Sequence, residues 1–239
     1  MVQGSTPLNR YDPLKLVNID MSTNEGILHA QKIGLANHAF VDIIITPHIF
    51  KTDHIFYGTD TRGRLFALFK DPVERAVDMF YYMKHATWEP TYDPKFQHMS
   101  IDQYSKSIYI QNNWMTRTLA NIPAHEQLTK EHLNIALEVM RTRILVGLSD
   151  SLEESLDRFE RYFSWRNDLD SNTQKLCRSR FLSRGYVNPN PKFKNLEQGT
   201  GAYHRIQMQN RFDLEIYEYA QSLFLDQREF VSRLVLKIT

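Results

Sequence analysis

The chain has 239 residues and a formal net charge of +1 at pH 7. Hydrophobic residues make up 42% and charged residues 24%, which is typical of a globular chain with one substantial core. The near-zero net charge argues against a duplex nucleic-acid binder with a strong basic field. Cys177 is the single cysteine, so we expect no intrachain disulfide, no zinc cluster and no metal.

The N-terminal quarter predicts the start of an α/β alternation. Leu16–Ile19 and the β-branched run Val41–Thr46 are interpreted as strands, the second one buried, and Ser22 or Thr23 is expected to cap a helix between them. His48 would then follow the end of the second strand.

The next stretch predicts a strand, a turn and a helix, around which the rest of the predicted fold is arranged. Leu65–Phe69 is a short apolar run without alternation, which suits a strand covered on both faces of a parallel sheet. Lys70 leaves this strand, Asp71 is a good N-cap, and Pro72 suits the first turn of a helix. A cation beside the free N–H groups of a helix N-terminus predicts an anion site at the carboxyl edge of the sheet.

The second half of the chain continues the alternation. Ile144–Leu148 predicts a further strand, and Ser151-x-x-Glu154 predicts a capping box for the helix after it. Asn210 is expected to cap a long closing helix. This order favours a parallel α/β sheet with right-handed crossovers.

The segment KDPVERAVDMFYY, which starts at Lys70, resembles the 3′-phosphate-binding segment of sulfotransferases that use 3′-phosphoadenylyl sulfate (PAPS). In the Golgi carbohydrate enzymes of that superfamily it reads roughly Arg-Asp-Pro-x-x-Arg-x-x-Ser-x-Tyr. Lys70 stands at the first arginine, Arg75 matches the second, and Asp78 replaces the serine with a negative charge. The resemblance implies a P-loop-like parallel sheet flanked by helices, the three-layer sandwich of sulfotransferases, with PAPS as co-substrate.

Two readings of Asp78 stay open. It can form a surface ion pair with Arg75, three residues earlier on the helix, in which case its charge is neutralised. Alternatively it faces the 3′-phosphate, which we expect to weaken binding about a hundredfold or more.

Two later segments extend the resemblance. Asn113-x-x-Thr116-Arg117-x-Leu is similar to a stretch that lines the nucleotide and acceptor cleft in heparan-type enzymes. Asn210-x-x-Asp213 opens a segment similar to the closing helix of the same group. The resemblance implies cleft contacts from Asn113, Thr116 and Arg117, whereas the residues alone equally suit a polar helix terminus with a surface arginine.

His48 lies 22 residues before Lys70. In similar glycan O-sulfotransferases a histidine at about this distance is the catalytic base, so the resemblance implies that role for His48. A neutral imidazole can take the proton of a sugar hydroxyl near pH 7. The alternative is an ordinary polar surface residue.

The range 175–194 contains six basic residues and no acidic one. The resemblance implies a late loop that closes over the adenosine, with Lys192 and Lys194 as cofactor-binding residues. A solvated loop is the equal alternative. Trp88, Tyr92 and Phe96 likewise suit either sugar stacking or ordinary packing.

The loop that binds the 5′-phosphosulfate in this family has no counterpart in the sequence. We therefore expect an irregular segment over 1–13 and a sulfotransferase-like domain over 14–239 that lacks its first β-loop-α unit. Intact relatives reside in the Golgi lumen behind a membrane anchor; no such anchor or signal peptide is present, which indicates a cytosolic protein or an incomplete chain.

The resemblance implies transfer of a sulfuryl group from PAPS to a hydroxyl of a glycan acceptor. The alternative from another class is a non-catalytic sulfotransferase-fold domain that binds glycan or nucleotide or serves as an interaction module. A P-loop kinase relative ranks last, because the sequence has no Gly-x-x-x-x-Gly-Lys-Ser/Thr string.

Overall fold

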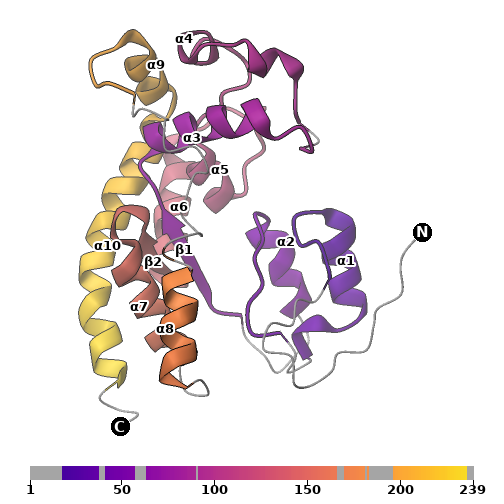
Figure 1. The fold of residues 1–239 in the computed structure, drawn as a ribbon, viewed down its shortest axis with the longest axis vertical. Coiled ribbons are helices and arrows are strands. Elements are labelled where there is room, and N and C mark those ends of the chain that lie inside the picture. Colours follow the sequence, from indigo (N-terminus) through magenta and orange to yellow (C-terminus); the bar gives the residue numbers. More distant parts are fainter. Residues whose placement is uncertain are drawn as a thin grey trace. The chain divides into compact units, whose positions relative to one another are not determined.

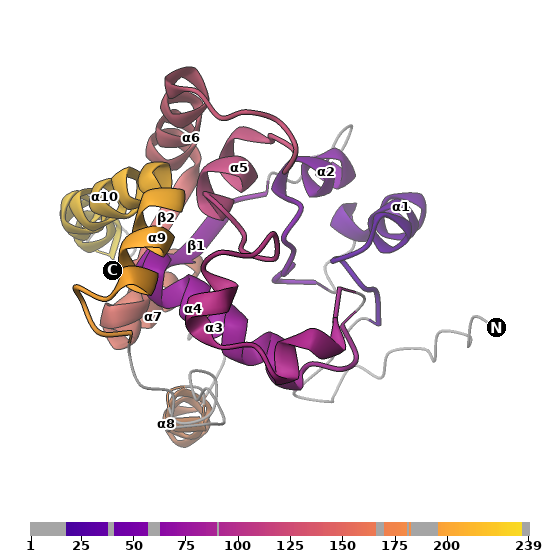
Figure 2. The ribbon, with the colours of Figure 1, turned by 90° about the horizontal axis from the view of Figure 1, so that it is seen from above.

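The computed structural model describes residues 18–37, 41–56, 63–89, 91–165, 170–180, 182 and 196–235. The chain divides into two compact units, Met1–Arg64 and Leu65–Thr239. Figures 1 and 2 show the helices and strands of each. In the described part of the chain, no helix is long and apolar enough to cross a bilayer.

The first unit is helical. Its elements are α1 (Asn24–Lys32), η1 (Leu35–Asn37), α2 (Ile49–Asp53) and η2 (His54–Phe56). Thr23 caps α1, because its side chain accepts a hydrogen bond from the Gly26 N–H at 3.0 Å. That capping prediction is confirmed. The small core of this unit consists of Met21, Ile27, Ala30, Leu35 and Ile55.

The two strands predicted for this unit are not formed among its described residues. Val41–Thr46 is irregular, and Ile43 and Ile45 are 42% and 85% exposed. Residues 18–20 are also irregular, while residues 16 and 17 lie outside the described ranges. The prediction of a buried strand before His48 is therefore wrong. β-Branched residues favour strands only where a neighbouring strand and a covering layer are available.

The second unit is mixed α/β and mostly helical. Its principal elements are β1 (Leu65–Phe69), α3 (Pro72–His85), α4 (Ile101–Tyr104), α5 (Trp114–Ala120), α6 (Lys130–Arg143), β2 (Ile144–Leu148), α7 (Leu152–Phe163), α8 (Ser171–Arg180), α9 (Gly201–Gln209) and α10 (Arg211–Val235). Short 3₁₀ turns are η3 (Pro94–Gln97) and η4 (Ser149–Ser151). The predicted strands at β1 and β2 and the α/β class are confirmed.

Within the described residues, β1 and β2 form a two-stranded parallel sheet with Leu65 opposite Ile144. β2 is buried throughout, whereas Leu68 of β1 is 43% exposed. The prediction that β1 is covered on both faces is therefore wrong. Helices α6 and α7 lie on opposite sides of the sheet, and α10 runs beside β2 (Figure 2).

Close contact between α7 and β2 depends on Gly147. A Cβ at this position would lie 2.6 Å from the Phe159 ring and 3.0 Å from the Ser155 Cβ. The Ser155 hydroxyl accepts a hydrogen bond from the Leu148 N–H at 2.9 Å. Helix α7 can therefore pack directly on the strand backbone.

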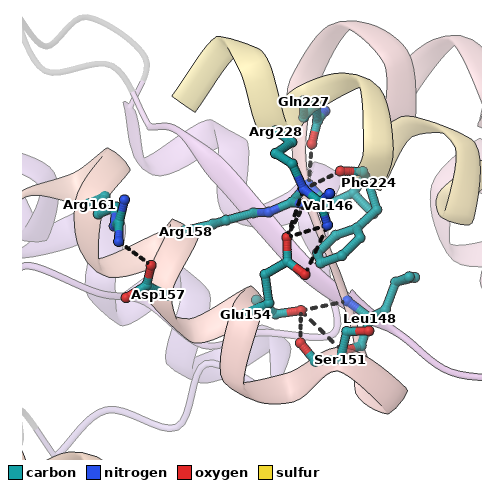
Figure 3. Close-up of polar contacts among 11 residues, drawn as sticks. Val146, Leu148, Ser151, Glu154, Asp157, Arg158, Arg161, Phe224, Gln227 and Arg228 are labelled. Atoms are coloured by element: carbon teal, nitrogen blue, oxygen red, sulfur yellow. Dashed lines mark hydrogen bonds and ion pairs between the residues drawn. The ribbon is translucent and has the colours of Figure 1, made fainter. Parts of the chain in front are cut away.

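A set of polar contacts, the α7–α10 clamp, joins the two helices on the sheet (Figure 3). It consists of Glu154, Arg158, Phe224 and Arg228. The guanidinium of Arg158 donates to the Phe224 carbonyl, lies 3.5 Å from the centroid of the Phe224 ring, and pairs with the Glu154 carboxylate at 2.6 Å. Arg228 donates to the same carboxylate at 3.0 Å.

Beside the clamp, Gln227 of α10 bonds to the backbone of β2. Its Oε1 accepts from the Val146 N–H at 2.8 Å, and its Nε2 donates to the Ile144 carbonyl at 2.9 Å. A side chain of α10 thus takes the place of a neighbouring strand on that edge of β2.

Candidate functional site

A cleft of about 460 Å³ opens at the carboxyl ends of β1 and β2. This is the edge at which ligands bind in parallel α/β sheets. Lys70 and Asp71 follow β1, and Asp150 follows β2. The lining residues are Lys70, Asp71, Val73, Glu74, Val77, Asp78, Asp150, Leu196, Glu197, Gln198, Tyr203, Tyr217 and Gln221.

Lys70 is paired with carboxylates of the helix that follows it. Its Nζ lies 2.5 Å from Asp78 Oδ2 and 3.8 Å from Glu74 Oε2. The Lys70 side chain is 24% exposed and that of Asp78 46%. Asp78 therefore pairs with Lys70, and not with Arg75 as one of its two readings held.

The N-terminus of α3 is capped by its own chain. Asp71 Oδ1 accepts from the N–H groups of Val73 and Glu74 at 2.9 and 3.0 Å. The Arg75 N–H donates to the Asp71 carbonyl at 2.8 Å, and Pro72 has no N–H. The cap at Asp71 is confirmed, but the prediction that this terminus offers free N–H groups to an anion is wrong.

The cleft is acidic. Its described lining residues include one lysine, Lys70, together with the carboxylates of Asp71, Glu74, Asp78, Asp150 and Glu197. Burial raises the pKa of Glu74; Lys70 opposes this rise, and the nearby carboxylates add to it. Burial also raises the pKa of Tyr217, whose hydroxyl donates to Asp150 Oδ2 at 2.7 Å. An anion that enters must compete with Asp78 for Lys70.

Arg75 does not line the cleft. Its guanidinium donates to the Gln111 side chain at 3.2 Å and to the Gln111 carbonyl at 3.3 Å, and it lies 5.1 Å from the centroid of the Trp114 ring. Burial lowers its pKa, which the Asp213 carboxylate opposes. The structure thus places Arg75 against the segment that leads into α5.

The two later segments of the resemblance form one buried set of hydrogen bonds, the α5–α10 cap network. It consists of Asn113, Thr116, Asn210 and Asp213. Asp213 accepts from the N–H groups of Met115 and Thr116 at 2.9 and 2.8 Å and from the Thr116 hydroxyl at 2.7 Å.

The network is reciprocal, because residues beside α5 also cap α10. Asn113 Oδ1 accepts from the Phe212 N–H at 2.9 Å, and Asn210 Oδ1 accepts from the Asn113 N–H at 2.9 Å. Thr116, Asn210 and Asp213 are fully buried and Asn113 is 8% exposed. Asn113 and Thr116 therefore cap and join helices, in place of the cleft contacts that the resemblance implies.

Arg117 holds the loop that follows α5. Its Nη1 donates to the carbonyls of Pro123 and Glu126 at 2.7 and 2.9 Å, and its Nη2 donates to Asn112 Oδ1 at 3.0 Å. These contacts match the reading of a surface arginine at a polar helix terminus.

His48 belongs to the first unit and precedes α2. The ring Nε2 of His48 lies 3.0 Å from the Ser22 carbonyl, and the backbone N–H of His48 donates to the Thr46 hydroxyl at 3.0 Å. Because a carbonyl can only accept, Nε2 carries the proton in this contact and a neutral ring presents Nδ1 as its acceptor.

Lys192 and Lys194 lie outside the described residues. The part of the basic range that the structure describes is helical: α8 carries Arg178, whose guanidinium contacts Glu160 Oε2 at 3.1 Å and Asp157 Oδ1 at 3.4 Å. These acidic residues belong to α7, so Arg178 attaches α8 to α7.

Several cleft residues were not predicted from the sequence. Asp150 directly follows the predicted strand Ile144–Leu148, so the strand-end rule that selected Lys70 would also have found it. Glu197, Tyr203 and Tyr217 come from segments far along the chain and carry no such local signal. The described residues contain no group of three or more His, Cys, Asp or Glu placed to hold a metal ion.

Comparison of the chain with family models, with curated proteins and with solved structures finds no match.

Proposed function

We propose that the chain is a sulfotransferase-type protein that binds the 3′-phosphate of PAPS at Lys70 and transfers a sulfuryl group to a carbohydrate hydroxyl. The observation that carries the proposal is the position of Lys70: it lines the cleft at the carboxyl end of β1, directly before the Asp71-capped helix. The donor and the acceptor class come from the sequence resemblance around it.

The cleft fits a phosphate in part only. Lys70 can bind the 3′-phosphate once it leaves Asp78, to which it is paired at 2.5 Å. The other acidic lining groups disfavour a doubly charged phosphate. In this proposal PAPS supplies the sulfuryl group, and the role of His48 as the base for the sugar hydroxyl rests on the sequence resemblance alone.

A second candidate is a non-catalytic domain of the same type. The observation that favours it is the internal occupation of the anion site: Asp78 pairs with Lys70, and Asp71 accepts from the first N–H groups of α3. In this case the cleft no longer supports sulfuryl transfer, whether or not it still binds a nucleotide.

Binding of adenosine 3′,5′-bisphosphate, the desulfated nucleotide, separates the candidates. Calorimetry on the wild type, Asp78→Ser and Lys70→Ala is the first measurement. We expect Asp78→Ser to tighten binding on the order of a hundredfold and Lys70→Ala to abolish it. Glu138→Gln, which breaks a 2.7 Å ion pair to Arg141 on α6, is the matched control and should change nothing.

Sulfate transfer from labelled PAPS to a mixed glycan acceptor is the second measurement. Nucleotide binding with transfer supports the enzyme. Nucleotide binding without transfer, in both the wild type and Asp78→Ser, supports the non-catalytic domain. No binding in any variant would remove the PAPS proposal.

A further inference from the structure

The last turns of α3 and the turn after it present two exposed aromatic rings, the aromatic pair Tyr82 and Trp88. Trp88 is 71% exposed and Tyr82 is 43% exposed. Their ring centroids lie 6.2 Å apart with the planes at 78°, an edge-to-face arrangement. Phe96, from the same aromatic segment, is 2% exposed and belongs to the core. Packing therefore explains Phe96 but not Trp88.

The backbone holds Trp88 at the tip of a defined turn. The Ala86 N–H donates to the Tyr82 carbonyl at 2.9 Å, and the Glu89 N–H donates to the Ala86 carbonyl at 3.0 Å. Ala86 is fully buried and anchors the turn. The indole is thus carried by an ordered backbone, so little backbone entropy is lost when a ligand binds to it.

A hydrogen-bonding group lies beside the rings. The Tyr82 hydroxyl donates to the Glu89 carboxylate, and this bond raises the pKa of Tyr82. A carboxylate has about four acceptor positions, so Glu89 can also accept hydrogen bonds from a ligand. The surface therefore combines apolar ring faces with a fixed acceptor at their edge.

We propose that Tyr82, Trp88 and Glu89 form a carbohydrate-binding platform. A pyranose ring has an apolar face of C–H groups and a rim of hydroxyls, which matches exposed ring faces beside a carboxylate. The size also fits: an aromatic side chain covers about 150–250 Å², whereas a stable protein interface needs about 800 Å² on each partner. The choice of a glycan as occupant rests on the proposed function.

The position of the platform indicates the length of the acceptor. Tyr82 lies four residues after Asp78, which lines the cleft, so these two residues share one face of α3 and are about 6 Å apart along its axis. Lys70 precedes the first residue of α3 and Tyr82 is the eleventh, so about 15 Å of helix axis separates the Lys70 end of the cleft from the platform. A glycan that reaches from the platform to the Lys70 end must therefore be an oligosaccharide, whereas a monosaccharide can contact one end only.

The test is calorimetric titration of a neutral hexasaccharide, cellohexaose, into the full chain. We expect Trp88→Ala to weaken binding about tenfold and Trp88→Phe to restore most of it. Ile108→Ala is the control, because Ile108 is another large apolar side chain, 94% exposed in the loop before α5. The Ile108→Ala variant should bind the hexasaccharide with the affinity of the wild type.

Three results would overturn the platform: no binding of the hexasaccharide to the wild type, equal affinity in Trp88→Ala, or equal loss in Ile108→Ala. Self-association in sedimentation experiments that disappears in Trp88→Ala would also overturn it, by assigning the aromatic pair to a protein contact. If the chain binds no nucleotide but binds the hexasaccharide with an affinity that depends on Trp88, the proposed function is wrong and the platform stands.

Discussion

Asp78 and Asp213 are carboxylates in two segments that resemble the same enzymes, but their surroundings differ. Asp78 lies in the open cleft, is 46% exposed as a side chain, and has Lys70 as its partner. Asp213 is fully buried and accepts from two backbone N–H groups and one hydroxyl. Water can replace the partner of Asp78, whereas nothing replaces the partners of Asp213. Burial, more than residue type, decides which carboxylate supports the fold and which is available for binding.

The largest effect should come from Asp213→Ala. It leaves the N–H groups of Met115 and Thr116 buried without an acceptor, so we expect the free energy of unfolding to fall by about 3 to 4 kcal/mol. Urea denaturation followed by circular dichroism measures it. Asp226→Ala, an exposed position on α10, should stay within about 0.5 kcal/mol of the wild type. Equal losses in the two variants would contradict a special role for the cap network.

Arg158→Met should be the next largest effect. The substitution keeps the apolar stem but removes the bonds to the Phe224 carbonyl and Glu154 and the contact with the Phe224 ring. We expect a loss of about 2 kcal/mol in the free energy of unfolding. The matched control is Arg161→Met, since Arg161 is 50% exposed and pairs with Asp157 at 2.8 Å on the same helix. If Arg161→Met lowers the free energy of unfolding as much as Arg158→Met does, the clamp contributes no more than an ordinary surface ion pair.

The clamp should also make stability depend on pH. Hydrogen bonds from Arg158 hold the pKa of Glu154 below its ordinary value of 4.5. Partial burial of the carboxylate opposes this lowering, and Arg228 adds to it. Because the folded-state pKa is the lower one, this stabilisation is present above about pH 4.5 and is lost as the pH falls through the folded-state pKa. Glu154→Gln should therefore cost about 1 kcal/mol or less at pH 7, and the cost should be smaller near pH 3. Unfolding curves of both proteins at the two pH values measure it, and a difference that is independent of pH would disprove the linkage.

The comparison also explains what the sequence could predict. The β1–α3 unit was predicted correctly because its signals are local: an apolar run, then Asp71 and Pro72 at the cap, then helical spacing. The role of Thr116 was not predictable, because Asp213 lies 97 residues further along the chain. Predicting this contact requires the tertiary fold.

Local signals also failed where tertiary contacts compete with them. Ser151-x-x-Glu154 has the pattern of a capping box, yet the Ser151 side chain makes no cap bond and Glu154 bonds to Arg158 and Arg228. By contrast, Ser100-x-x-Gln103 forms both bonds of a capping box on α4, where Gln103 is exposed. The free N–H groups expected at the start of α3 were likewise removed by the side chain of Asp71, the same residue that made the helix predictable.

The smallest effect on stability should come from Asp78→Ser, the counterpart of Asp213→Ala in the cleft. The pair with Lys70 is partly exposed, so its loss should change the free energy of unfolding by no more than about 0.5 kcal/mol. The same substitution removes a negative charge beside Lys70 and should raise the affinity for adenosine 3′,5′-bisphosphate. Urea denaturation and calorimetry on one preparation measure both quantities. A stability loss close to that of Asp213→Ala would mean that Asp78 is a structural residue. The negative charge of Asp78 in the cleft would then be explained by its role in the fold and would be no evidence for a bound ligand.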